Sequence, residues 1–146
     1  MTAARLVAGA GGYDGGVPSI QLPADRRAAS RARRFVVATL EGWGMPQAVI
    51  DDCELLTSEL VTNAVLHARS ESRLRIERRG DNVWVAVHDA SPSEPRVRDY
   101  GPNAVTGRGL MLVDRLAGRW GSENDAHGKF VWFELPARIE SGEVLA

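Results

Sequence analysis

The chain has 146 residues, a length typical of a single domain. Its 18 basic and 19 acidic residues give a formal net charge of −1, which excludes the strong positive charge of proteins that bind nucleic acid or anionic lipid through electrostatics alone. Hydrophobic residues make up 44% and charged residues 25%, so we expect one sizeable core and exclude a disordered or collagen-like chain.

Cysteine content and hydropathy indicate the cellular compartment. The only cysteine, Cys53, excludes an internal disulfide and a metal site built from several cysteines. No run approaches the roughly 18 consecutive apolar residues of a membrane helix, and the N-terminus lacks the pattern of a signal peptide. We therefore expect a cytoplasmic protein that has no membrane partner and no direct nucleic-acid partner.

The N-terminal segment differs in composition from the rest of the chain. Residues 1–16 hold five of the 15 glycines and show no sustained hydrophobic period, so we expect a flexible leader there. A short, partly alternating run over 17–22 is bounded by prolines and predicts an edge strand. The folded domain is expected over 17–137, and residues 138–146 are expected to form a C-terminal tail.

Two amphipathic helices are predicted next. Apolar residues recur at three- and four-residue steps over 24–40, and a longer helix free of glycine and proline is predicted over 47–68. At about 100° per residue, one stripe of the second helix is apolar and should face the core. The stripe consists of Val49, Cys53, Leu56, Leu60 and Ala64.

The second half of the chain predicts a sheet. Strands are expected over 73–79, 82–89 and 130–135, with a further strand over 119–122 and a short apolar helix over 109–116. Runs of helices followed by runs of strands favour an α+β fold. We predict a two-layer sandwich with helices packed on one face of a mixed, mostly antiparallel sheet.

Two polar residues border the apolar stripe of the second helix. Glu59 and Asn63 are four residues apart and face a common spot. A carboxylate there could act as a general base, and an amide oxygen suits a hard cation such as Mg²⁺. The alternative is a boundary pair that faces water. His67, one turn further, is expected to be a hydrogen-bonded core histidine.

A third polar residue ends a predicted strand. Asp89 is in phase with Val83, Val85 and Val87 by the two-residue period of a strand, so a carboxylate ends a buried row. A buried charge requires a donor, such as the exocyclic amine of adenine in a bound ligand. The alternative is an aspartate that caps the following loop through backbone N–H groups.

A long connection follows this strand. Residues 90–106 show no clear period and are typical of a lid or a binding loop. The connection ends in the series Thr106, Gly107, Arg108, Gly109 and Leu110, which opens the short helix. Backbone N–H groups at a helix N-terminus favour phosphate, and an arginine can clamp it. Neither a Walker A loop nor a dinucleotide-binding fingerprint is present.

Four segments follow one another along the chain: ELVTNAVLHA at 59–68, VHDASP at 87–92, TGRGL at 106–110 and GKFVW at 128–132. Taken in this order, they resemble the ATP-binding domain of the GHKL superfamily, with its Bergerat fold, and specifically its branch of anti-sigma-factor serine/threonine kinases. The resemblance covers roughly residues 19–135. It implies an α/β sandwich in which ATP lies between the helices and the lid.

The resemblance also implies roles for individual residues. Asn63 would ligate the Mg²⁺ that bridges the phosphates of ATP, and Asp89 would accept the adenine amine. Thr106 to Leu110 would bind the phosphates, with Gly107 and Gly109 approaching them closely and Arg108 nearby. Glu59 would be the catalytic base.

The implied activity is an ATP- and Mg²⁺-dependent serine/threonine protein kinase. Its substrate would be an anti-anti-sigma protein, and its other partner a sigma factor or a similar regulator; the family also forms homodimers. The chain departs from the family where residues 90–93 replace glycines and where Lys129 and Phe130 replace a threonine. The rival hypothesis is a non-catalytic, nucleotide-gated module that binds a regulatory protein.

Overall fold

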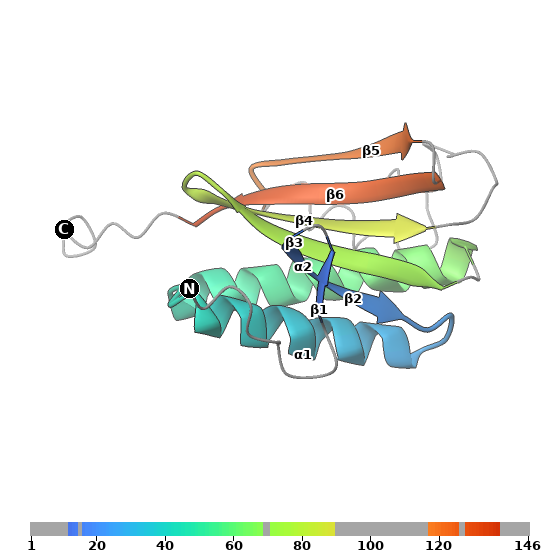
Figure 1. Ribbon diagram of the computed structural model, residues 1–146, viewed down its shortest axis with the longest axis horizontal. Coiled ribbons are helices and arrows are strands. Elements are labelled where there is room, and N and C mark those ends of the chain that lie inside the picture. Colours follow the sequence, from blue (N-terminus) through green and yellow to red (C-terminus); the bar gives the residue numbers. More distant parts are fainter. Residues whose placement is uncertain (1–11, 15, 69–70, 90–116, 126–127, 138–146) are drawn as a thin grey trace.

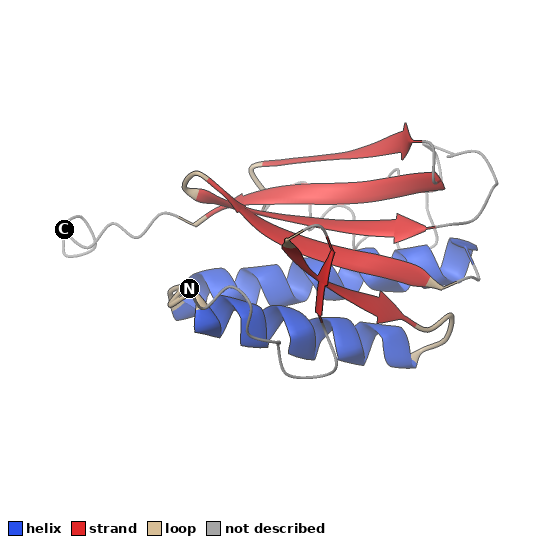
Figure 2. Cartoon of the chain, viewed as in Figure 1, coloured by secondary structure: helices blue, strands red, loops and turns tan. Residues whose placement is uncertain are grey.

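The computed structural model describes residues 12–14, 16–68, 71–89, 117–125 and 128–137, and these form two layers (Figure 1). Helices α1 (Arg27–Gly42) and α2 (Gln47–Ala68) lie side by side on one face of a sheet. No helix covers the opposite face within the described part of the chain (Figure 2). The predicted two-layer α+β sandwich is therefore confirmed.

The described residues form six strands of the sheet. They are β1 (Gly12–Asp14), β2 (Val17–Leu22), β3 (Ser72–Arg79), β4 (Asn82–Asp89), β5 (Arg119–Asp125) and β6 (Gly128–Pro136). Their order across the sheet is β1-β2-β3-β4-β6-β5. Every neighbouring pair among these described strands is antiparallel, so they show no parallel component of the kind that the predicted mixed sheet would contain.

Several element boundaries differ from the predictions. The predicted leader contains β1, which pairs with β2, so β2 is not the outermost strand. Helix α1 begins three residues later than expected, because Asp25 lies outside it and accepts a hydrogen bond from the backbone N–H of Arg27 at 2.8 Å. Ser72 belongs to β3, one residue before the predicted start.

The turn between β3 and β4 explains their register. Arg79 is the partner of Asn82, so only Gly80 and Asp81 connect the two strands. Gly80 has a φ of 62°, a left-handed conformation that glycine adopts without the steric penalty of a Cβ atom. This turn fixes the pairing along both strands, up to the opposition of Ser72 and Asp89 at the far end.

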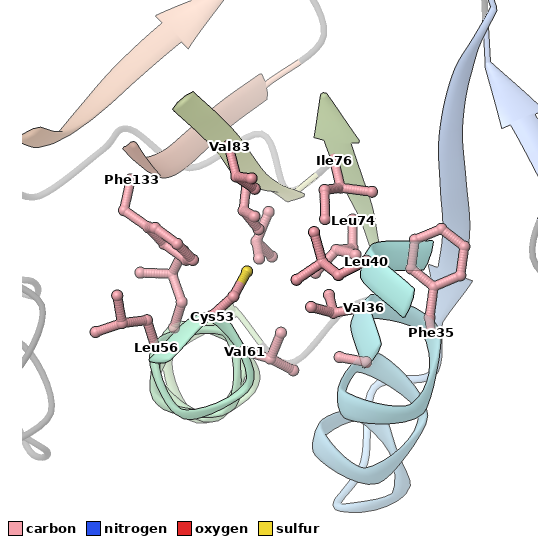
Figure 3. Packing of buried hydrophobic residues seen from close by; sticks show 14 of the residues in the cluster. Phe35, Val36, Leu40, Cys53, Leu56, Val61, Leu74, Ile76, Val83 and Phe133 are labelled. Atoms are coloured by element: carbon pink, nitrogen blue, oxygen red, sulfur yellow. The ribbon is translucent and has the colours of Figure 1, made fainter. Parts of the chain in front are cut away.

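The core lies between the helices and the sheet (Figure 3). The predicted stripe of α2 is confirmed at Cys53, Leu56, Leu60 and Ala64, each 5% exposed or less, while Val49 is only partly buried. Cys53 points toward Val83 of β4. Burial raises the pKa of the Cys53 thiol to about 12, so this group stays protonated and packs as a small apolar side chain.

The helix-free face of the sheet holds polar and aromatic side chains in contact with one another. The guanidinium of Arg79 lies 3.8 Å from the centre of the Trp84 ring, and the indole N–H of Trp132 donates to Glu123 at 3.1 Å. A Cβ atom at position 121 would meet the Trp132 indole at 3.0 Å, so glycine there leaves room for the ring beside β5. Trp84, which takes part in these contacts, is only 6% exposed although it lies on the face without helices.

Candidate functional site

Helix α2 carries the predicted base and the predicted metal ligand, and it packs against β4 and β6. Glu59 is half-buried, as expected for a residue beside the stripe. Asn63 is 0% exposed and thus fully buried beside the residues of the stripe. The alternative of a pair facing water therefore fails for Asn63. Burying an amide costs free energy that an apolar residue would not, which favours a specific role.

The end of the sheet brings two other polar residues together. Asp89 is the last residue of β4, and its Cα partners are Ser72 on β3 and Lys129 on β6. Ser72 is in phase with the core residues Leu74 and Ile76 and is only 3% exposed. Its hydroxyl oxygen is buried and has no hydrogen-bond partner. The structure thus adds a buried hydroxyl directly opposite the predicted adenine-binding position.

Sequence reasoning missed Ser72, although a signal was present. The alternation of Leu74 and Ile76 extends back to position 72, so the two-residue period places a serine on the buried face. The predicted strand began at Arg73, which hid this phase. Ser72 is therefore a polar residue that continues an apolar row of a strand, which makes it a candidate site residue in the same way as Asp89.

Other predicted site residues lie outside the described part of the chain. These are the lid over 90–106, the phosphate-binding series over 106–110 and the short helix over 109–116. The side chains of His67 and Asp89 are outside it as well. Their proposed contacts therefore stay predictions.

The polar groups at hand fit a magnesium nucleotide. Among the described residues, no group of three or more His, Cys, Asp or Glu side chains is placed to hold a metal. Asn63 offers one amide oxygen, and Mg²⁺ in nucleotide sites takes one or two protein ligands together with waters and phosphate oxygens. A buried amide and a buried hydroxyl on the helix-covered side are donor and acceptor groups of the kind that nucleotide pockets use to fix orientation.

Neither α1 nor α2, the two described helices, is both long and apolar enough to cross a membrane.

Comparison with known sequences decides the family. A sequence model of the histidine kinase-like ATPase domain matches residues 22–135, which includes both helices and the sheet from the end of β2 to most of β6. The chain belongs to the histidine kinase-like ATPase family. The matched model describes an ATPase domain, and domains of this kind bind ATP. No curated protein matches the sequence.

Solved structures support the same fold for this histidine kinase-like ATPase domain. The histidine kinase domain of the blue-light activated histidine kinase EL346 from Erythrobacter litoralis has a TM-score of 0.53 and 22% identity, covering 79% of this chain. This chain spans 61% of that domain. The catalytic domain of the histidine kinase ThkA has a TM-score of 0.50 and 18% identity, with coverage of 84% of this chain and 99% of that domain. At these identities the likeness shows the fold alone.

Proposed function

We propose that the protein is an ATP- and Mg²⁺-dependent serine/threonine protein kinase of the anti-sigma-factor type. The observation that carries the proposal is the pair on α2: a buried Asn63 and a half-buried Glu59, one helical turn apart, in a histidine kinase-like ATPase domain. An amide and a carboxylate at this spacing can act at the same phosphate group, one as a metal ligand and one as a base.

Nucleotide binding in this proposal uses residues from three parts of the chain. Asn63 would hold Mg²⁺ through its amide oxygen, and Asp89 would accept the adenine amine. The backbone N–H groups of Gly107 and Gly109, with the side chain of Arg108, would bind the phosphates. Bound Mg²⁺ supplies neutralisation of the phosphate charge, which together with positioning is most of what phosphoryl transfer requires.

Glu59 acts as the base in the transfer step. Its carboxylate takes the proton from a serine or threonine hydroxyl while the hydroxyl oxygen attacks the γ-phosphorus of ATP. The bond between the γ-phosphorus and the oxygen that bridges to the β-phosphate breaks, and ADP leaves with that oxygen. The products are a phosphorylated partner and ADP, and Glu59 then releases its proton to solvent.

The partner chemistry follows from the branch that the sequence resembles. The phosphate acceptor would be an anti-anti-sigma protein, and its phosphorylation would free the kinase to hold a sigma factor or a similar regulator. The serine/threonine specificity is supported by the four motif segments in their order, and the ATP-binding fold by the family match.

The experiment that tests this proposal measures phosphate transfer to a purified anti-anti-sigma protein in the presence of Mg-ATP. Mass spectrometry detects the phosphorylated serine or threonine. We expect Glu59→Gln to slow transfer by about 100-fold or more, since general bases contribute factors of this size. Nucleotide affinity, measured by calorimetry, should change little.

The matched control is Glu54→Gln, which removes another half-buried carboxylate of α2. It lies on a different side of the helix from Glu59, so transfer should stay within about twofold of the wild type. If the wild type binds Mg-ATP but transfers no phosphate to any tested partner, the kinase proposal fails and the nucleotide-gated binding module replaces it.

A further inference from the structure

We propose that Ser72 is an adenine-recognition residue, whose hydroxyl donates a hydrogen bond to ring nitrogen N1 of the bound base, directly or through one water. This inference rests on the proposed binding of ATP. It assigns a role to a side chain outside the four motif segments, and it makes a prediction about a single atom of the ligand.

The first support is burial without a partner. Ser72 is 3% exposed, and its hydroxyl oxygen is among the few buried polar side-chain atoms of the described residues that have no hydrogen-bond partner. A buried hydroxyl is normally paired, since leaving it unpaired costs free energy that an alanine at the same place would not. An unpaired hydroxyl is therefore a candidate for a ligand contact.

The second support is register. Ser72 and Asp89 are Cα partners in the antiparallel pairing of β3 with β4, and the Cβ atoms of such partners lie about 4.5–5.5 Å apart. Ser72 shares the buried phase of Leu74 and Ile76, which is the side that α1 and α2 cover. The hydroxyl thus lies at the same end of the same face as the predicted partner of the adenine amine.

The third support is the match between these groups and one edge of adenine. That edge presents an amine, which donates, beside ring nitrogen N1, which accepts. A carboxylate can only accept, whereas a serine hydroxyl can donate. Asp89 and Ser72 together therefore complement adenine. Guanine presents a carbonyl oxygen and a ring N–H at the same places, so the carboxylate would face an acceptor.

The test compares Mg-ATP with its 1-deaza analogue, in which a carbon replaces N1, by calorimetric titration. We expect the wild type to bind ATP about tenfold more tightly than the analogue, the value of one hydrogen bond. Ser72→Ala should bind ATP about tenfold more weakly than the wild type does, and it should bind the two ligands with equal affinity. The 7-deaza analogue, altered on the other side of the ring, keeps N1, so its affinity should fall in Ser72→Ala as much as that of ATP.

Ser19→Ala is the matched control. Ser19 is 2% exposed on the neighbouring strand β2, but its hydroxyl accepts a hydrogen bond from Arg73 on the helix-free face. This variant should keep the wild-type ratio between ATP and 1-deaza-ATP. A thermal melt of each variant without nucleotide verifies that it is folded.

The outcomes separate the two proposals. If the folded wild type binds no Mg-ATP, the proposed function fails, and the inference fails with it. If the wild type binds ATP but Ser72→Ala keeps the wild-type ratio between the two ligands, Ser72 has no role in recognition while the proposed function stands.

Discussion

Two buried polar side chains on opposite faces of the sheet, Glu134 and Ser72, differ in how they are paired. On the helix-free face, Glu134 accepts hydrogen bonds from Arg119 at 2.6 Å and from Asn82 at 2.9 Å. On the helix-covered face, the hydroxyl of Ser72 is equally buried but has no partner. The hydrogen bonds of Glu134 stabilise the sheet itself, whereas the Ser72 hydroxyl adds nothing to the folded state without a ligand. This difference is the basis of the ligand contact that we propose for Ser72.

The largest expected effect comes from the apolar part of the covered face. Leu60 is 1% exposed on α2, and Leu60→Ala should lower the free energy of unfolding by about 2–5 kcal/mol because it removes buried methyl groups and leaves a cavity. Urea unfolding followed by circular dichroism measures the change. Leu55→Ala is the control: Leu55 is 40% exposed on the same helix, and its change should stay within about 0.5 kcal/mol. Equal effects would contradict a closed interface between helices and sheet.

Periodicity predicted most of this interface correctly, because the interface is set by local pattern. The bounds of α2 and β4 match the predictions, as the hydrophobic period of each runs to its ends. The predictions were least accurate at the strand β1 in the N-terminal segment. Its three residues carry no hydrophobic period, and it depends on pairing with β2 rather than on its own sequence.

The candidate site was predictable only where polar residues interrupt an apolar pattern. Glu59, Asn63 and Asp89 stood out in this way, and the structure adds that Asn63 is deeply buried. Ser72 was not found, since its meaning depends on the register between β3 and β4, which brings it opposite Asp89 from a position 17 residues away along the chain. Strand pairing is a tertiary property that a single-residue pattern does not contain.

A smaller effect is expected on the helix-free face. Glu134→Gln removes the charged group that accepts the hydrogen bonds from Arg119 and Asn82. We expect this variant to lower the free energy of unfolding by about 1–2 kcal/mol at neutral pH. The bond from Arg119, followed by that from Asn82, holds the pKa of Glu134 below its ordinary value of 4.5. The folded state therefore binds this proton less readily than the unfolded state does.

The sign of the pH dependence follows from that difference. The contribution of Glu134 to stability is fully present above the unfolded-state pKa, near 4.5, and is lost as the pH falls through the lower folded-state value. Denaturant midpoints of the wild type and Glu134→Gln should converge as the pH is lowered from 4.5. Glu123→Gln, which alters an exposed carboxylate on the same face, should change the denaturant midpoint less than Glu134→Gln does at neutral pH. A gap for Glu134→Gln that widens in acid would contradict the paired state of Glu134.

The smallest effect compares one serine from each face. Ser19 accepts a hydrogen bond from Arg73 at 3.2 Å, so Ser19→Ala should lower the free energy of unfolding by about 0.5–1 kcal/mol. Ser72→Ala removes a buried hydroxyl that has no partner, so stability without nucleotide should stay the same or rise slightly. With saturating Mg-ATP, the wild type should instead be more stable than Ser72→Ala, because it binds the ligand more tightly and gains more stabilisation from it. Thermal melts with and without Mg-ATP measure both quantities on the same samples. A loss at Ser72 as large as that at Ser19 in the absence of nucleotide would mean that the Ser72 hydroxyl supports the fold, and the contrast between the two serines would then disappear.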